Sequence, residues 1–429
     1  MVPQQWLQHA PPPRPLKNNQ QWNVFLSYRS INRPWVLNLY DVLIETGHKV
    51  FLDQYVLTPG GELITQLQDG LDMSQAAILI WSTSTRDSDW VRKEYNALET
   101  KATEDDEFFF VPIKIDSSEL PLFARNRIYL DFSGYPDGPN GGDLIRLLHG
   151  IVGKPLSPEA VRFAEEQNAA TKQSIIEIKA AIKNGNINKL VELSLQQTLP
   201  WKTSSSIGCS VAEGLIKLKA NDEAIALLNR LTNEFPKAIR PRQLISLAFA
   251  RRGNEGDLEK AQDILGNLYE DNNMDPETMG IYGRTWMDRY DKTKDINDLI
   301  QSRDLYAEAF DRSPDDYYTG INAAAKSIFI GTPENIGKGI NYAERVQTLV
   351  GTQPIPGDYW KTATVAEALL IQKKYIEAAN IYSKAISYGR SEKGSIESTI
   401  GQVMRLLEKL SPSSSDREAI LRAFPDEKN

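Results

Sequence analysis

The feature that most constrains the fold is a change in sequence pattern near residue 155. Between residues 22 and 152, short runs rich in β-branched and aromatic residues alternate with segments whose apolar residues recur at helical spacing. Alternating strands and helices predict a parallel sheet covered by helices on both faces. Beyond this point helical patterns follow one another. We therefore expect an extended Pro/Gln-rich leader outside the fold at 1–20, an α/β domain at 21–155 and an all-α domain at 156–429.

Within the α/β domain the pattern predicts individual elements. The expected strands are residues 22–28, 49–53, 76–82, 108–115 and 128–131. The expected helices are residues 34–46, 62–73, 90–101 and 143–152. The strand at 76–82 is almost continuously apolar, which is typical of a strand buried on both faces of a parallel sheet.

The helical domain carries a weak internal repeat. A small residue followed by large apolar residues recurs at Ala224, Ala261, Ser302, Ala343 and Ala378, at offsets of 37, 41, 41 and 35 residues. Stacked helix pairs have this signature. The period is longer and less regular than the roughly 34 residues of ideal tetratricopeptide repeats. We expect a tetratricopeptide-like solenoid that opens with one long helix at 158–184; an irregular helical bundle is the alternative.

Charge and composition exclude several classes of protein. The 49 Lys and Arg against 57 Asp and Glu give a net charge of −8, which disfavours nucleic acid as the main partner. One cysteine, Cys209, excludes a disulfide framework within the chain and a Cys-rich metal site, and three histidines are too few and scattered for a His-based metal site. We expect Cys209 to be a small core residue. No apolar run reaches the roughly 20 residues of a membrane span, and the N-terminus has no apolar signal region. We therefore expect a cytoplasmic protein with no membrane partner.

The common catalytic motifs are missing from the sequence. It has no phosphate-binding P-loop, no G-x-G-x-x-G after the first expected strand, no H-E-x-x-H and no nucleophile elbow. These absences disfavour nucleoside-triphosphate hydrolysis, Rossmann-type redox chemistry, zinc proteolysis and α/β-hydrolase chemistry.

Four other segments resemble a known family. They are FLSYRS at 25–30, GHKVFLD at 47–53 with LTPG at 57–60, DWVRKE at 89–94, and FVPI at 110–113. In order and spacing they resemble the boxes of Toll/interleukin-1 receptor (TIR) domains of bacterial type. The third segment is similar to the W-x-x-x-E helix of the TIR domains that cleave NAD+. The resemblance covers about residues 20–155.

This resemblance implies a flavodoxin-like, five-stranded parallel sheet and an NAD+ nucleosidase. Glu94 matches the family's catalytic glutamate, and Trp90, one helical turn earlier, matches an aromatic residue that lines the pocket. Nicotinamide leaves as a neutral ring, so the reaction needs no general acid. A carboxylate beside the ribose can stabilise its oxocarbenium-like transition state. The resemblance implies NAD+ as substrate, no further cofactor and no metal.

The resemblance also implies residues that bind the nucleotide. Tyr28 and Arg29 follow the first expected strand and Asp53 ends the second, at the carboxyl edge where doubly wound sheets bind ligands. Leu57 lies in the next loop, which in the family gates the pocket and joins neighbouring TIR domains. The Lys or Arg that active enzymes carry in this loop has no match in Gln54-Tyr55-Val56.

Each of these residues also has an alternative structural role. Glu94 is otherwise an exposed helix carboxylate, and Trp90 packs the helix on the sheet. Arg29 pairs with a neighbouring acid, and Asp53 caps the loop.

The helical domain resembles, at low specificity, the tetratricopeptide-like TRAF-binding region of some stress kinases, over residues 291–309 and 314–318. Solenoids offer concave surfaces to partners. We expect an NADase that is activated by TIR self-association, or by a protein or ligand trigger on the helical domain, in bacterial defence against phage. A non-catalytic signalling scaffold, and an enzyme acting on another nucleotide, are the alternatives. The product, the trigger and the oligomeric form are left open.

Overall fold

The protein is described from a computed structural model of the chain. The structure describes residues 4–29, 32–53, 63–82, 89–120, 127–135, 138–271, 274–389 and 393–424, with backbone alone at 34, 63–64, 89–94 and 393–395. The chain forms two compact units, Met1–Asp275 (unit 1) and Pro276–Asn429 (unit 2).

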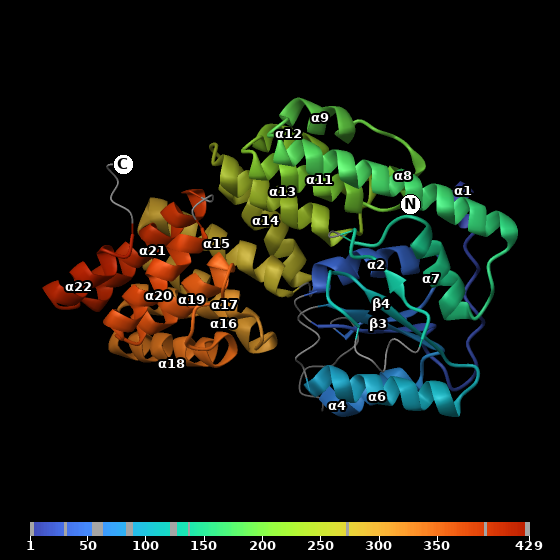
Figure 1. Ribbon diagram of the computed structural model, residues 1–429, viewed down its shortest axis with the longest axis horizontal. Coiled ribbons are helices and arrows are strands. Elements are labelled where there is room, and N and C mark those ends of the chain that lie inside the picture. The colour runs from blue at the N-terminus through green and yellow to red at the C-terminus, as the bar shows by residue number, and fades with distance from the viewer. Residues whose placement is uncertain are drawn as a thin grey trace. The chain divides into compact units, whose positions relative to one another are not determined.

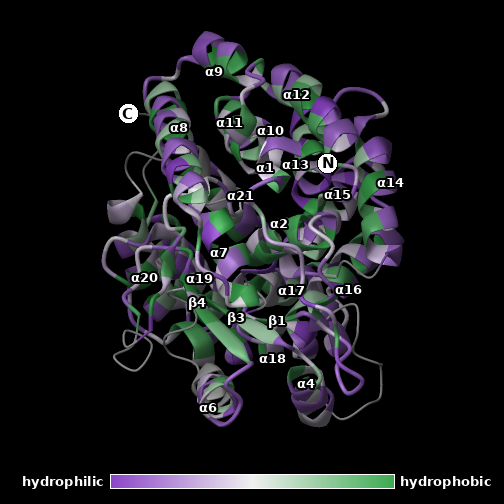
Figure 2. Ribbon diagram, turned by 90° about the vertical axis from the view of Figure 1, so that its right-hand side faces the viewer, coloured by the Kyte–Doolittle hydropathy of each residue, from purple (hydrophilic) through white to green (hydrophobic). Residues whose placement is uncertain are grey.

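Unit 1 contains the expected five-stranded parallel sheet. The strands are β1 (Val24–Ser27), β2 (Val50–Phe51), β3 (Ala76–Trp81), β4 (Phe109–Lys114) and β5 (Leu130–Asp131). Their order is β2-β1-β3-β4-β5, and every neighbouring pair is parallel. The central strand β3 is buried along its whole length, and it has hydrophobic colouring in Figure 2. The alternation of strand and helix patterns therefore predicted the fold class correctly.

Helices cover both faces of this sheet. They are α2 (Arg33–Glu45), α4 (Leu63–Asp72), α6 (Asp89–Glu104) and α7 (Gly142–Val152). Figure 1 shows α2 and α7 on one face, and α4 and α6 on the other. Each helix is amphipathic because one face packs on the sheet and the other faces away from it.

The next helices of unit 1 form an all-α layer. They are α8 (Pro158–Lys183), α9 (Ile187–Ser194), α10 (Leu199–Thr203), α11 (Ser206–Lys217), α12 (Asn221–Glu234), α13 (Ile239–Arg252) and α14 (Asp257–Glu270). The long helix expected at 158–184 is α8. Cys209 lies in the core of this layer and is 0% exposed, as the sequence predicts. Because these helices share a compact unit with the sheet, the boundary at residue 155 stays a prediction.

A close approach ties α8 to the α/β part. A Cβ on Gly142, at the start of α7, would lie 1.8 Å from the carbonyl oxygen of Ala164 in α8. No side chain fits in that space, so only glycine allows the two helices to pack this closely.

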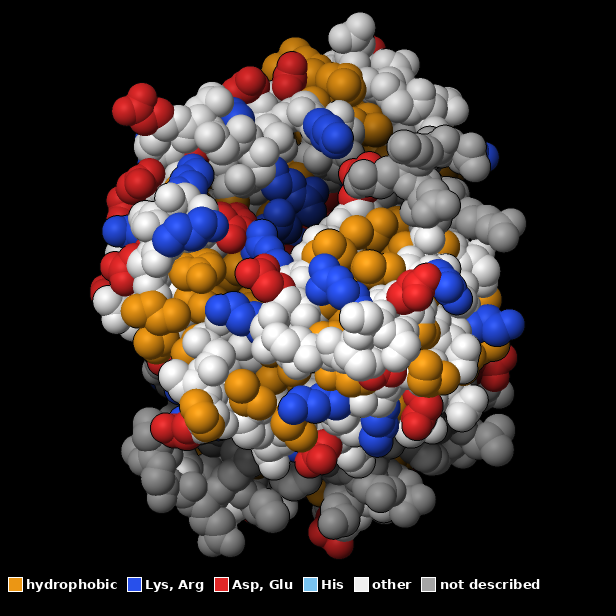
Figure 3. Space-filling view, turned by 90° about the vertical axis from the view of Figure 1, so that its left-hand side faces the viewer, with side chains coloured by type: hydrophobic (Ala, Val, Ile, Leu, Met, Phe, Trp, Pro, Cys, Tyr) orange, Lys and Arg blue, Asp and Glu red, His pale blue; other side chains and the backbone are white. Residues whose placement is uncertain are grey.

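Unit 2 consists of helices, of which the first six pack in sequential pairs while the last two pack on helices of earlier pairs. They are α15 (Pro276–Thr293), α16 (Ile296–Arg312), α17 (Tyr317–Ile330), α18 (Pro333–Val350), α19 (Tyr359–Ile371), α20 (Tyr375–Tyr388), α21 (Lys393–Leu410) and α22 (Ser414–Leu421). On the face shown in Figure 3, acidic and basic side chains are interspersed over most of the surface.

The repeat found in the sequence corresponds to helix pairs that continue from unit 1 into unit 2. Its small residues lie on the second helix of successive pairs, α12, α14, α16, α18 and α20. All of them are 0% exposed: Ala224, Ala261, Ser302, Ala343 and Ala378. A small side chain at this position lets the two helices of a pair approach closely, which explains its recurrence. The solenoid of tetratricopeptide type is confirmed.

The N-terminal segment differs from the leader outside the fold that the sequence predicts. Residues 11–17 are indeed neither helix nor strand, but α1 (Gln4–Leu7) is a short helix in which Trp6 is only 1% exposed. The His9 ring stacks on Phe163 of α8, with 4.2 Å between ring centroids. Proline prevents regular structure here, but it does not prevent single side chains from packing on the domain.

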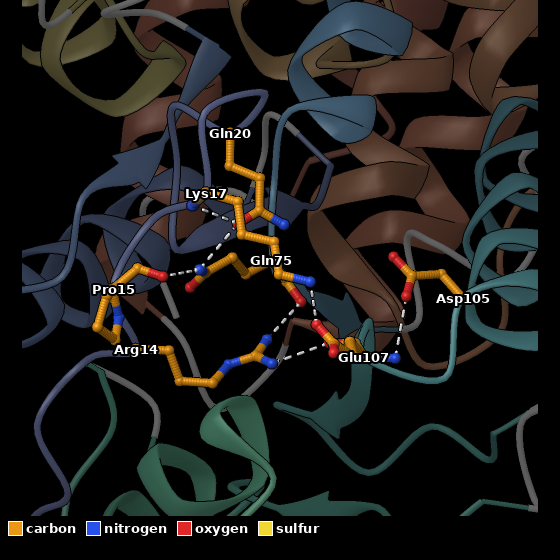
Figure 4. Close-up of polar contacts among 7 residues, drawn as sticks. All are labelled: Arg14, Pro15, Lys17, Gln20, Gln75, Asp105 and Glu107. Atoms are coloured by element: carbon orange, nitrogen blue, oxygen red, sulfur yellow. Dashed lines mark hydrogen bonds and ion pairs between the residues drawn. The ribbon is translucent and has the colours of Figure 1, made fainter.

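Figure 4 shows how this segment binds the sheet. The guanidinium of Arg14 donates to the carbonyl oxygens of Gln75 and Glu107, both at 3.0 Å, and lies over the ring of Phe109. Gln75 precedes β3 and Glu107 precedes β4, so Arg14 joins the amino ends of two neighbouring strands. Lys17 forms an ion pair with Glu107.

Arg14→Ala is expected to destabilise unit 1 by about 1–3 kcal/mol, because it removes the charged donor to the partly buried carbonyl oxygen of Gln75 and to the exposed carbonyl oxygen of Glu107. A lower urea midpoint of the full chain measures the effect. The matched control is Arg162→Ala, which removes a side chain that is 70% exposed and is expected to change the midpoint little. Equal midpoints for the two variants would contradict the structural role of Arg14.

No helix among the residues that the structure describes is both long and apolar enough to cross a membrane.

Candidate active site at the carboxyl edge of the sheet

The parallel pairing of β1 and β2 places the ends of both strands at one edge of the sheet. Val24 pairs with Val50 and Phe25 with Phe51. The residues that follow, Tyr28 after β1 and Asp53 after β2, therefore meet at the carboxyl edge.

Tyr28 and Asp53 are joined directly. The Tyr28 hydroxyl donates to Oδ1 of Asp53 at 2.6 Å. Burial raises the pKa of Tyr28 well above its ordinary value, and the Asp53 carboxylate adds to this rise. The hydroxyl is therefore protonated at neutral pH and acts as a donor. Both residues follow their strands at the carboxyl edge, as expected from the sequence, while their role in binding a nucleotide stays a prediction.

A third residue, Arg33, completes this cluster and was missed by the sequence analysis. Its Nη2 lies 3.3 Å from Oδ2 of Asp53, and its guanidinium lies 5.4 Å from the centre of the Tyr28 ring. Arg33 is the first residue of α2. A basic residue at the start of the helix that follows the first strand was the available signal, because that helix begins at the carboxyl edge.

Two further contacts at this edge fix the loops. The Asn32 side chain donates to Oγ of Ser82 at 2.7 Å, which joins the segment after β1 to the end of β3. The Trp81 indole donates to the carbonyl oxygen of Glu119 at 3.2 Å, which joins β3 to the segment after β4. Arg29 follows Tyr28 at the same edge and is half-buried.

The remaining predicted residues are described only in part. Trp90 and Glu94 lie in the first half of α6, one turn apart, but their side chains are outside the described residues. Leu57 lies in the segment 54–62, which is also outside them. Because α6 is the helix that follows β3, its first turns are near the carboxyl edge by topology.

The described part of the chain contains no group of three or more His, Cys, Asp or Glu side chains able to hold a metal ion. What this edge offers chemically is a partly buried hydroxyl, a carboxylate and a guanidinium within contact distance of one another. Such a set suits a ligand that carries hydroxyl groups and negative charge.

Comparisons with known proteins agree with both parts of the chain. A family model described as "TIR domain" matches residues 24–146. A model described as "Tetratricopeptide Repeats-Sensor" matches residues 220–327. A comparison with curated proteins finds no match.

The chain is also similar to solved tetratricopeptide structures. One is TTC0263, a thermophilic TPR protein of Thermus thermophilus, at 14% identity and a TM-score of 0.36, over 48% of this chain and 98% of that one. Another is the TPR domain of P58(IPK), at 13% identity and a TM-score of 0.23, over 67% of this chain and 76% of that one. These scores are too low to carry an argument, so the assignment depends on the family matches, the sheet topology and the buried repeat positions. The chain therefore has a TIR domain at its N-terminus, followed by sensor repeats of the tetratricopeptide type.

Proposed function

We propose that the TIR domain cleaves the bond between nicotinamide and ribose in NAD+, releasing nicotinamide and either ADP-ribose or a cyclic isomer of it. The observation that carries this proposal is the place of the W-x-x-x-E pair, Trp90 and Glu94. The pair lies in the first half of α6, the helix that follows β3, and by topology this helix begins near the carboxyl edge where Tyr28 and Asp53 meet.

The chemistry of the cluster supports this substrate. Cleavage develops positive charge on the ribose, which the Glu94 carboxylate can stabilise without a general acid, since nicotinamide leaves as a neutral ring. Asp53 is suited to accept a hydrogen bond from a ribose hydroxyl. Arg33 and Arg29 are suited to the pyrophosphate, because guanidinium groups bind phosphate oxygens in a bidentate way. NAD+ is the substrate, and this scheme uses no other cofactor.

In this proposal the sensor repeats regulate the cleavage of NAD+. An NADase that is always active would consume the NAD+ of its own cell. We therefore expect a resting state that changes when TIR domains associate, or when a protein or ligand binds the helical repeats, in bacterial defence against phage.

Nicotinamide release measured by chromatography tests the proposal. Purified protein at low and high concentration, with and without a crowding agent, is incubated with NAD+. Release should rise more steeply than in proportion to protein concentration. A TIR domain that is forced to oligomerise and still releases no nicotinamide would overturn the proposal and favour the signalling scaffold.

A further inference from the structure

Helix α2 is bound by the helical layer of unit 1 through buried polar side chains. The Ser205 hydroxyl, between α10 and α11, donates to Oδ1 of Asn38 in α2 at 2.9 Å. Asn38 is 3% exposed and Ser205 is 2% exposed. α2 also packs against α13.

A second set of hydrogen bonds lies beside this contact. The Asn140 amide, just before α7, donates to the carbonyl oxygen of Pro200 and to Oγ of Ser206, both at 3.1 Å. The Ser204 hydroxyl donates to the carbonyl oxygen of Pro139 at 3.1 Å. We call Asn38, Asn140 and residues 204–206 the latch.

The latch is formed by polar groups, and a contact of this kind can open at a low cost in free energy. On separation its hydroxyl and amide groups can exchange their partners for water, so little net free energy is lost per hydrogen bond. A contact of the same size between large apolar side chains would expose apolar surface and resist opening more strongly.

A buried carboxylate lies at the same contact between α2 and the helical layer. Asp41 of α2 lines a small cavity with Asn38, Glu45, Ser205 and Lys237. Its Oδ2 atom is buried and has no hydrogen-bond partner among the described residues. An ionised carboxylate in that position opposes closure of the contact.

Helix α2 also reaches the candidate active site. Arg33, its first residue, contacts Asp53 and Tyr28, while Asn38 lies five residues later on the same helix. At a rise of about 1.5 Å per residue these two points are only about 8 Å apart along a rigid element. A shift of α2 at the latch therefore moves Arg33.

We propose that the latch holds α2 in a resting position, and that its release by the sensor repeats repositions Arg33 at the candidate active site and raises NAD+ cleavage. The effect on cleavage depends on the proposed function, whereas the coupling between latch and site does not.

Ser205→Asp tests the proposal by placing a carboxylate against the Asn38 carbonyl oxygen and near Asp41. Hydrogen exchange should become about tenfold faster or more in residues 33–45 and faster in the neighbouring segment 46–53. Exchange in β3 should keep the wild-type rate, which separates local release from general unfolding. Ser205→Ala, which only removes the hydrogen bond, should give the same pattern with a smaller increase in the exchange rate. It also tests the proposal if Ser205→Asp fails to fold.

Nicotinamide release is the second readout, at a protein concentration where the wild type is nearly silent. Ser205→Asp should raise it about tenfold or more, and the control Ser387→Asp, an exposed serine of unit 2, should not. Unchanged exchange in 33–45, or faster exchange without faster cleavage, would overturn the proposal. In the second case, cleavage by concentrated wild type would show that the proposed function still stands.

The latch should also respond to pH through Asp41. Burial raises the pKa of Asp41 to about 7; Glu45 on the same helix raises it further, while Arg242 of α13 and Lys237 before α13 lower it. Since the folded pKa exceeds the unfolded one, the closed latch is favoured at low pH and loses stability as the pH rises toward 7. Exchange in residues 33–45, corrected for the intrinsic rate, should be faster at pH 8 than at pH 6. Asp41→Asn should abolish this difference; a difference that persists would contradict the role of Asp41.

Discussion

Glu94→Gln should lower nicotinamide release by about 100-fold or more while leaving the fold intact. The substitution keeps the size of the side chain and removes its negative charge. Removing one group that stabilises transition-state charge typically costs 10²–10³ in kcat. If the carboxylate stabilises the developing positive charge on the ribose, kcat should fall much more than the affinity for NAD+.

The matched control for this variant is Glu104→Gln, which makes the same change on an exposed residue at the other end of α6. It should release nicotinamide at the wild-type rate. Circular dichroism and the oligomeric state of both variants should match the wild type. Normal release by Glu94→Gln would overturn the catalytic role of Glu94, whereas the absence of release from the wild type as well would favour the scaffold.

Lys326→Met should destabilise unit 2 by about 3 kcal/mol or more, because it leaves a carboxylate buried without its cation. Lys326 of α17 is 5% exposed and Glu367 of α19 is 8% exposed. The Lys326 ammonium donates to Oδ1 of Asn322 at 2.7 Å, and Glu367 accepts from the amide of Gln402 at 2.6 Å. Burial lowers the pKa of Lys326 and raises that of Glu367, and their mutual attraction opposes both shifts.

The pH dependence of this variant follows from the raised pKa of Glu367. Without Lys326 that pKa rises further, so the folded state is favoured while Glu367 is protonated and loses stability as the pH increases. The loss caused by Lys326→Met should therefore be larger at pH 8 than at pH 5. Hydrogen exchange in α17 and α19 of the full chain measures this loss as a local free energy of unfolding.

Two controls complete this experiment. Lys338→Met breaks an exposed pair with Glu334, 2.7 Å apart on α18, and should cost less than about 0.5 kcal/mol. Lys326→Met combined with Glu367→Gln should be more stable than Lys326→Met alone. A double variant as unstable as the sum of the two single ones would contradict the electrostatic coupling of Lys326 and Glu367.

Much of the architecture could be predicted because it depends on local patterns. Alternating apolar segments between residues 22 and 131 indicated a parallel sheet. In such a sheet the carboxyl ends of all strands lie at one edge, so Tyr28 and Asp53 could both be expected there, although not in direct contact. The small residues from Ala224 to Ala378 indicated the close contact within each helix pair, because every pair needs a small side chain at the same position.

Contacts between side chains far apart in sequence were decided only by the tertiary structure. The packing of Arg14 on Gln75 and Glu107, the bond from Ser205 to Asn38 and the burial of Lys326 near Glu367 have no local signature, because each depends on how two separate elements approach. Arg33 joins Tyr28 and Asp53 for the same reason. By itself the sequence determined the parallel sheet, the helix pairs and the candidates for catalysis, since hydrophobic periodicity and the alternation of strand and helix patterns are local properties of the chain. Only the tertiary structure decided which polar groups are buried together, since burial depends on packing between distant segments.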